Sequence, residues 1–452
     1  MDQSSESNTF NWFGESVLIK LGLIGVLTLL LLIPSGWIQD IILERQERQD
    51  EVNKEISDKW SGSQLLEGPV LILPYTTSVA HKDTAGKTIY REALTNIYIL
   101  PEKLNVQSKA NPEILHRGIF DAVVYNTRIK VTGKFSALEL KKSGINPELI
   151  QWDKAKLDIG LSDLKGLKNN PIVSLNKIDY PVEPDFTTLK LFTNNLIAMP
   201  DLSNQRNTAL DFSFNLDLRG SNELSFLHLG KTTTVNVEGN WNNPSFTGQY
   251  LPEHRNVSKE GFRAKWEMPY FNRPFPQQWI AANSALHTAG TNASFGVKFI
   301  LPVDQYQKTM RSAKYAILII LLTFISLFFT ELLNKRKVHL LQYVLIGAAM
   351  TIYYTLLLSF SEQVGFTLAY IIASVATVLL IGVFITSLIH SKKTALIFSG
   401  ILSVFYSFVF VIIQLQDLAL LFGSVGLFIT VAVMMHLSVR IDWNRKQEVE
   451  IA

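Results

Sequence analysis

Six long apolar stretches constrain this chain more than any other feature of its sequence. One precedes a long polar block, and five follow that block in close succession. The first stretch, residues 17–38, is interrupted only by Lys20. It is long enough to cross a membrane, because about 20 helical residues span a hydrocarbon core of about 30 Å. The sequence therefore predicts six transmembrane helices, arranged as one plus five, the later stretches lying near residues 313–330, 340–360, 366–389, 395–413 and 418–438.

The short links between these stretches give the orientation. Cytoplasmic links of membrane proteins carry an excess of Lys and Arg. The loops at 361–365 and 414–417 contain neither residue. The links after the second and fourth stretches and the C-terminal tail are basic, with Lys335, Arg336, Lys337, Lys392, Lys393, Arg440, Arg445 and Lys446. We therefore predict that both termini are cytoplasmic and that the polar block lies on the outer side of the membrane.

A cleaved signal peptide is the alternative interpretation of residues 17–38. Such a peptide has a positively charged beginning and a small-x-small cleavage site. This chain has no Lys or Arg before Lys20, and its segment LLIPSGWIQD lacks the cleavage pattern. An uncleaved membrane anchor is the favoured interpretation.

The polar block has the pattern of a helical stalk followed by a β-rich domain. Residues 39–60 are rich in helix formers and contain Glu–Arg and Glu–Lys pairs at the favourable i, i+4 spacing. Beyond Trp60, short β-type runs are separated by Gly, Pro and Asn. The clearest run alternates apolar and polar residues and places five apolar side chains on one strand face: Leu210, Phe212, Phe214, Leu216 and Leu218. Because strands do not alternate with helices, we predict a large all-β domain resembling an antiparallel sandwich.

These features divide the chain into seven segments. The predicted fold class is a mixed membrane protein, with six transmembrane α-helices and the β-rich domain between helix 1 and helix 2. Whether that domain is one β-structure or two is left open. Lys308, Arg311 and Lys314 have helical spacing, which predicts that the link into the second span is also helical. The segments are a cytoplasmic N-terminus (1–16), transmembrane helix 1 (17–38), a membrane-proximal stalk (39–60), a periplasmic β-rich domain (61–304), a connector (305–312), a five-helix transmembrane domain (313–438) and a cytoplasmic tail (439–452).

The composition argues against most kinds of chemistry. Cysteine is absent, which excludes disulfides, thiolate metal sites and a cysteine nucleophile. No two of the eight histidines have metal-ligand spacing, and the chain contains no HExxH, GxSxG, P-loop or dinucleotide motif. The net charge of +3 is too small to hold nucleic acid. We therefore predict no enzyme activity, no catalytic, cofactor-binding or metal-binding residue, and no nucleic-acid partner.

A few residues remain as weak candidates for a site. Tyr353 and Tyr354 lie in the middle of a span and could line a cavity, although packing is the simpler explanation. Glu362 and Asp417 lie on the outward loops, where they could bind a cation or a basic partner, although solvated loop acids are commoner. Four tryptophans of the exported block could form a sugar-stacking surface, although β-cores use Trp more often: Trp152, Trp241, Trp266 and Trp279.

Several segments in the same order resemble the CreD family of bacterial inner-membrane proteins. They include WSGSQLLEGPVLILPY at 60–75, LSDLKGL at 161–167, GVKFILPVDQYQKTMRSAKYAILIILLTFISLFFTE at 296–331 and QDLALLFGSVGLFITVAVMMHLSVRIDWN at 416–444. Two departures from the family pattern are Lys165, where Arg is commoner, and Asn444, where Tyr is. Lys lacks the planar fork of Arg, so a bidentate contact at position 165 is in doubt. The resemblance implies a role in cell-envelope integrity, envelope stress and colicin tolerance, and supplies no catalytic residue.

We therefore expect a non-enzymatic protein of the bacterial inner membrane. Its partners are the lipid bilayer and an unknown envelope protein, glycan or lipid that the periplasmic β-domain binds. The alternative is a membrane transporter or lipid-handling protein that works through the five C-terminal helices. An envelope enzyme is a third possibility, and it would need acids or histidines gathered in one exported cleft.

The predicted orientation can be tested with reporter fusions. A periplasm-active enzyme fused after Gln416 should be active, and the same enzyme fused after Ala452 should be inactive, because the two positions lie on opposite sides of the membrane. Cell-associated reporter activity measures the outcome. The reverse pattern would overturn the topology.

Overall fold

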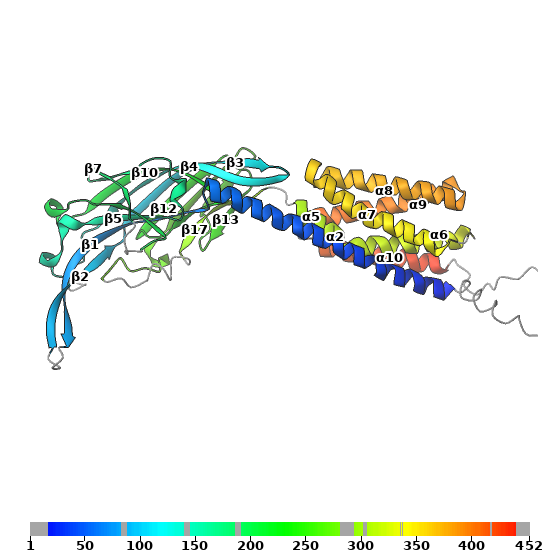
Figure 1. Cartoon of the computed structure of the whole chain (residues 1–452), viewed down its shortest axis with the longest axis horizontal. Helices are drawn as coiled ribbons and strands as arrows, with labels where there is room; N and C mark the ends of the chain where they lie inside the picture. The colour runs from blue at the N-terminus through cyan, green and yellow to red at the C-terminus, as the bar shows by residue number, and fades with distance from the viewer. Residues whose placement is uncertain are drawn as a thin grey trace, which may run out of the picture. The chain divides into compact units, whose positions relative to one another are not determined.

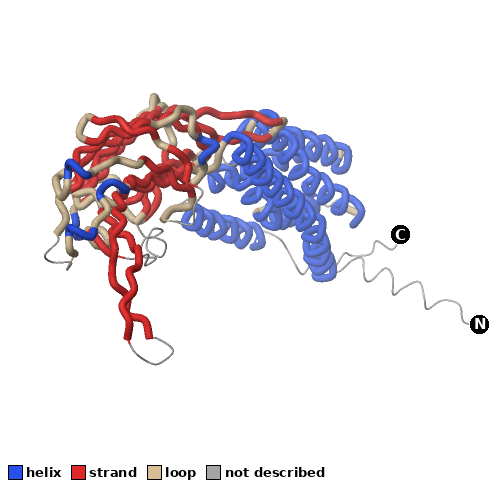
Figure 2. Tube along the Cα trace, turned by 60° about the vertical axis from the view of Figure 1, so that its left-hand side comes forward, coloured by secondary structure: helices blue, strands red, loops and turns tan. Residues whose placement is uncertain are grey.

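The computed structural model divides the chain into a β unit, Gln49–Pro302, and a helical unit formed by Met1–Arg48 with Val303–Ala452. The residues that it describes are 17–82, 88–139, 145–185, 191–280, 293–301, 305–334, 336, 338–415 and 418–439. The first unit consists mainly of strands and the second of helices (Figure 2).

The helical unit confirms the one-plus-five pattern, since six described helices are long and apolar enough to cross a membrane. One further short helix, α5, precedes the second span and ends at Lys314, so the basic residues at helical spacing do lie on a helix. The helices are α2 (Val17–Trp60), α5 (Gln305–Lys314), α6 (Ala316–Asn334), α7 (Leu340–Val364), α8 (Phe366–Ile389), α9 (Lys392–Gln414) and α10 (Ala419–Val439), as labelled in Figure 1.

Helix α2 is continuous over 44 residues and contains both the first apolar stretch and the charged segment that follows it. Its first turns belong to the helical unit and its last turns to the β unit. Pro34 lies inside it without ending it. One helix therefore connects the two units.

The loop expected at 361–365 is much shorter than its sequence indicates. Helix α7 continues to Val364, and α8 begins at Phe366. Gly365 alone separates them, with a φ of 77° that favours glycine, and its N–H donates to the carbonyl of Ser361. Polar residues in this segment are therefore helical, which hydropathy alone did not reveal.

The β unit consists of two sheets. The nine-stranded sheet A has the order β13-β17-β11-β1-β5-β9-β8, with β2 pairing to β1 and β16. The eight-stranded sheet B has the order β14-β15-β12-β3-β4-β10-β6-β7. Their strands are β1 (Gln64–Lys82), β2 (Thr88–Ile99), β3 (Lys103–Arg117), β4 (Phe120–Phe135), β5 (Lys156–Leu161), β6 (Ile172–Leu175), β7 (Ile178–Pro181), β8 (Glu183–Asp185), β9 (Asn194–Ala198), β10 (Leu210–Ser221), β11 (Glu223–Leu227), β12 (Thr232–Gly239), β13 (Pro244–Gly248), β14 (His254–Val257), β15 (Phe262–Met268), β16 (Gln278–Ile280) and β17 (Ser294–Phe299).

The expectation of purely antiparallel sheets is wrong. Strand β1 pairs with β11 in parallel, and β3 pairs with β12 in parallel, while the other pairs are antiparallel. Alternation along a strand fixes which face is buried, but it carries no information about the direction of the neighbouring strand. The sheets are therefore mixed, with a sandwich-like core.

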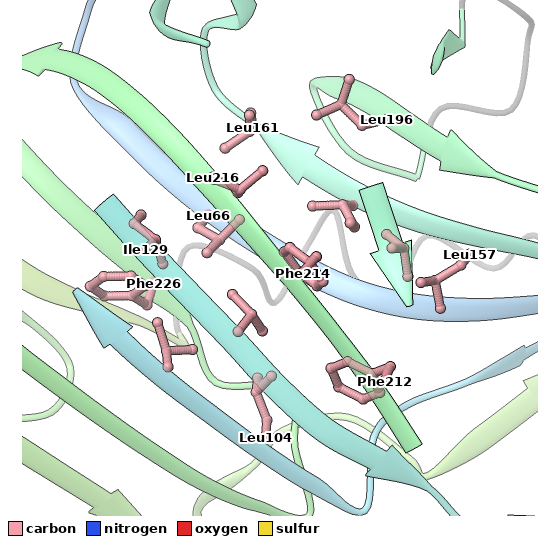
Figure 3. Packing of buried hydrophobic residues seen from close by; sticks show 14 of the residues in the cluster. Leu66, Leu104, Ile129, Leu157, Leu161, Leu196, Phe212, Phe214, Leu216 and Phe226 are labelled. Atoms are coloured by element: carbon pink, nitrogen blue, oxygen red, sulfur yellow. The ribbon is translucent and has the colours of Figure 1, made fainter. Parts of the chain in front are cut away.

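That core is a single apolar cluster drawn from both sheets. Figure 3 shows Leu157 and Leu161 of sheet A close to Phe212, Phe214 and Leu216 of sheet B. The alternation predicted for β10 is confirmed, because its five apolar residues are all buried at 3% exposure or less. One face of sheet B is thus committed to the core, and the other is left for solvent.

Candidate functional site

A polar hollow of about 780 Å³ lies on the face of sheet B that points away from the core. Strands β3, β4, β10, β12, β14 and β15 form it. The apolar residues beneath it, such as Ile129, Leu216 and Val237, are almost fully buried. Successive side chains of a strand point to opposite faces, so burying these residues places their polar neighbours in the hollow.

The register of sheet B arranges these polar side chains in two rows across six strands. Each row takes one residue from every strand, and neighbouring rows are two residues apart along the chain. The first row is Asn256, Arg263, Glu238, Lys109, Arg128 and Asp217. The second row is His254, Lys265, Asn236, Gln107, Lys130 and Asn215. We call these twelve residues, with the space above them, the sheet B hollow.

Positive charge dominates the lining. It includes six Lys or Arg residues, Arg255 among them, against two acids. Each acid faces an arginine of the neighbouring strand, with 3.5 Å from Arg128 Nε to Asp217 Oδ1 and 3.6 Å from Arg263 Nε to Glu238 Oε2. Both arginine side chains remain more than 80% exposed. A surplus of positive charge over a concave surface attracts anions.

The lining of the hollow consists mainly of cationic and amide side chains, with two acids and one histidine. His254 is the one histidine among its lining residues. The one hydroxyl there belongs to Ser108, which is buried and bonded to Thr127 at 2.9 Å. Within the described part of the chain, no three His, Asp or Glu residues are placed to hold a metal ion. Cationic and amide groups are what this surface offers to a ligand.

A second group of ionisable side chains lies on the far face of sheet A. Asp158 and Glu67 share this face with a smaller apolar cluster that contains Val70 and Phe192. Asp158 is completely buried, and neither carboxyl oxygen has a hydrogen-bond partner among the described residues. An ionised carboxylate in such a place would be very costly.

Burial accordingly raises the pKa of Asp158 to about 8, and the nearby acids Asp185 and Glu67 raise it as well, while Lys156 opposes the shift. Burial also raises the pKa of Glu67 to about 7. Tyr98 of β2 lies close to Asp158, and burial raises the pKa of Tyr98 as well. Asp158 is thus a mostly protonated carboxyl at neutral pH, and its energetic role concerns stability.

A partly buried ion pair links three helices of the helical unit. Lys20 of α2 contacts Glu331 of α6, which also accepts the hydroxyl of Tyr343 at 3.1 Å and the backbone N–H of Val338 at 3.1 Å. Lys20 also donates to the carbonyl of Val338 at 3.0 Å. Charges within membrane helices are costly unless paired, and this pair is well satisfied. Its contacts tie α2 to the α6–α7 link.

The weak candidates of the helical unit occupy structural positions. Glu362 is in the last turn of α7, where it accepts the hydroxyl of Tyr306 at 3.1 Å and lies 3.8 Å from Arg45 Nε, so it is no free loop acid. Tyr353 and Tyr354 are buried. Their rings pack in an aromatic cluster with Tyr370 and Tyr406. Asp417 lies outside the described residues.

The proposed tryptophan platform is absent from the surface. Trp152, Trp241 and Trp266 are buried at 8% exposure or less in the main core. Trp279 is partly buried and stacks on Tyr98 with ring centroids 5.2 Å apart. These residues supply core volume.

The end of α2 is fixed in the β unit by Asp163, which lies in the LSDLKGL segment. Its carboxylate accepts from the N–H of Gly62 at 3.1 Å, the hydroxyl of Ser61 at 3.2 Å and the N–H of Lys165 at 3.0 Å. Burial opposes ionisation, but these hydrogen bonds prevail and the pKa of Asp163 is lowered. Lys165 Nζ makes a single bond, to the carbonyl of Asp58 at 3.2 Å, so a lysine is sufficient here.

Sequence reasoning missed the sheet B hollow, because its residues are spread from position 107 to position 265. One local signal was available. In β4 and β15 the outward positions hold cations, as in Arg128 and Lys130 or Arg263 and Lys265. Only the strand order shows that these positions share one surface.

Comparison with known proteins gives a consistent result. The profile of one protein family, described as inner membrane protein CreD, matches residues 16–444. The inner membrane protein CreD of Escherichia coli strain K12 is 31% identical over 418 residues, which cover 92% of this chain and 91% of that protein. A crystal structure from Parabacteroides distasonis, named as a protease candidate, is 6% identical and covers 57% of this chain and 50% of that one. Its TM-score of 0.24 is too low to carry an argument.

The buried acid of sheet A should give the β unit a distinctive pH dependence. A native pKa of about 8 lies above the unfolded value of about 3.9. Stability due to this group is therefore fully present at low pH and falls by about 1.4 kcal/mol per pH unit as the pH rises toward 8. Asp158→Asn should remove this loss. The difference in the free energy of unfolding between the variant and the wild type should therefore grow in favour of the variant between about pH 5 and pH 8. Unfolding of the purified full chain, followed by tryptophan fluorescence, measures it.

Asp163→Asn provides the matched control for this experiment. Because the pKa of Asp163 is lowered, its contribution is present at neutral pH and lost as the pH falls through that pKa. The control variant should therefore be less stable than the wild type at neutral pH. Equal pH profiles for wild type and Asp158→Asn would contradict an ionisable buried carboxyl at position 158.

The ion pair of α2 and α6 should show strong coupling in a double-mutant cycle. Lys20→Met or Glu331→Gln alone leaves its partner unsatisfied and should lower the free energy of unfolding. The double variant should lose less of this free energy than the sum of the two single variants, by about 1 kcal/mol or more. Unfolding in mixed detergent micelles measures each variant. Lys314→Met with Glu331→Gln is the control, because Lys314 lies just before the start of α6 and Glu331 lies 15 residues further along it than Ala316, about 22 Å along the helix axis. Additive losses for Lys20 and Glu331 would show that the contact is unimportant.

Proposed function

The chain belongs to the CreD family of inner membrane proteins, and from this premise we propose that it is a non-enzymatic protein of cell-envelope integrity that binds an envelope component. It crosses the membrane with six helices. In this proposal the helical unit anchors the protein, and the β unit binds the component.

The sheet B hollow is the observation that carries the proposal. It is a continuous surface built by six strands, it has a surplus of positive charge, and its arginine side chains are exposed. Acids offset three of the six cations, since Asp217 faces Arg128, Glu238 faces Arg263 and Glu267 contacts Lys265. The remaining positive charges stay together despite their mutual repulsion, which supports recognition of an anionic partner.

The proposed location of the β unit is the periplasm. Support comes from the basic links after the second and fourth spans, Lys335–Lys337 and Lys392–Lys393, and from the loops without Lys or Arg on the opposite side. With both termini cytoplasmic, the β unit faces the cell wall. A ligand of the hollow would then be a component of the envelope.

A transporter or lipid-handling role through the five C-terminal helices is the second candidate. One observation favours it: the hydroxyls of Tyr354 and Tyr406 and the hydroxyl of Ser312 are buried without a hydrogen-bond partner among the described residues. Unpartnered buried polar atoms in a membrane domain are potential points of contact for water or a polar solute. The close ring packing of the tyrosine cluster, with centroids 4.8 Å apart, favours a structural role.

The proposed function can be tested by reversing the charge of the hollow. The triple variant Lys109→Glu, Arg128→Glu and Lys130→Glu should fail to restore envelope resistance to detergent in a strain that lacks this protein. The control carries the same change of charge at three exposed lysines of the same unit outside the hollow: Lys154→Glu, Lys177→Glu and Lys298→Glu. The control should restore resistance, with both proteins present at wild-type levels by immunoblot. Full resistance with the hollow variant would overturn the proposal.

A further inference from the structure

Resting on the proposed function, we propose that the sheet B hollow binds an anionic glycan, a chain of hydroxyl-bearing units that also carries carboxylate groups. The hollow is uncovered by any described segment, and three properties of its side chains point to this ligand. These are the spread of the cations, the amides between them, and the burial of the apolar side chains of the lining, Ile129, Leu216, Val237 and Ala264.

The cations of the hollow are spread out, which suits a chain better than a single small anion. Arg263 and Lys265 lie on β15, Arg128 and Lys130 on β4, and Lys109 on β3 between them. Three strand intervals separate β15 from β4, which is about 14 Å at the usual spacing of strands. Two residues along a strand add about 7 Å in the other direction. One phosphate or carboxylate could touch only a part of this set.

Amide side chains occupy the positions between the cations. Gln107, Asn215 and Asn236 belong to one row of the hollow, and Asn256 ends the other row. A carboxamide donates and accepts hydrogen bonds at once, as a hydroxyl does, whereas carboxylates and phosphates only accept. A surface made solely for negative charge would have no use for these acceptors. A hydroxylated chain with spaced negative charges matches both groups.

Other occupants fit the hollow less well. Lipid tails need an exposed apolar surface, but Ile129, Leu216 and Val237 lie beneath the polar rows at 1% exposure or less. An extended peptide usually adds to a sheet edge through its main chain, and the hollow is on the face of sheet B. A glycan can lie across a sheet face, because it is recognised through side chains.

Binding of oligogalacturonate to the purified full chain in detergent tests this assignment. The matched probes are a neutral maltooligosaccharide of similar length and an oligoglutamate of similar charge, measured by calorimetry. We expect oligogalacturonate to bind more tightly than both. Its affinity should fall at least about tenfold when salt is raised from about 0.05 to 0.5 M, because exposed charges are screened.

Two variants assign the binding to the hollow and to its chemistry. Arg128→Glu with Lys130→Glu should weaken oligogalacturonate binding at least about tenfold, while the control triple variant described above should bind as the wild type. Asn215→Ala with Asn236→Ala should weaken oligogalacturonate binding and leave oligoglutamate binding unchanged. Circular dichroism and monodispersity show whether each variant is folded, and the conservative Arg128→Lys variant should retain most of the binding.

Each contrary result has a definite meaning. Equal binding of oligogalacturonate and oligoglutamate would show a general polyanion surface and overturn the glycan assignment. Binding of the maltooligosaccharide alone, or of no probe, would overturn it too. If no probe binds and the charge-reversed hollow still loses envelope resistance in cells, the proposed function stands and this inference fails. If resistance is unaffected, both fail.

Discussion

The pleat of the β-strands is the constraint on which the β unit depends. Each strand of sheet B must bury every second side chain to build the core, which fixes the remaining side chains on the opposite face. Because β3, β4, β10, β12 and β15 are paired in register, their outward residues become rows that continue from strand to strand. The hollow and the core are thus two consequences of the same pairing. A register slip of one residue in β4 would bury Arg128 and expose Ile129.

The sequence was sufficient for the features that are local. Spans follow from runs of apolar residues, and the faces of β10 follow from the alternation of Phe212 and Phe214 with polar residues. It was insufficient where distant segments meet. The parallel pairs of β1 with β11 and of β3 with β12 depend on how the chain returns to the sheet, which alternation does not encode. The end of α7 was misplaced for a related reason, since Glu362 is polar but is satisfied by Tyr306 within the bundle.

Glu331 and Glu362, two acids of the helical unit, each have more than one structural partner. Glu331 is saturated by Lys20, Tyr343 and a backbone N–H, and Glu362 is held by Tyr306 and Arg45. A residue that carries a proton or an ion must exchange partners during its work, and groups with several fixed bonds resist this. The tyrosine cluster is packed ring against ring. These features favour a helical unit that serves as an anchor, in agreement with the part assigned to it above.

The far faces of the two sheets of the β unit differ in the charges that they carry. On the far face of sheet A, Asp158 and Glu67 are withdrawn from water, and their raised pKa values show that the fold disfavours negative charge there. On the far face of sheet B, cations from several strands stay exposed, although Asp217, Glu238 and Glu267 each pair with one of them. An apolar cluster with Phe192 lies over part of sheet A, whereas the equivalent position on sheet B is polar. Because core formation imposes the same demand on both sheets, it cannot explain this difference. A requirement that the far face of sheet B contact a negatively charged ligand would explain it.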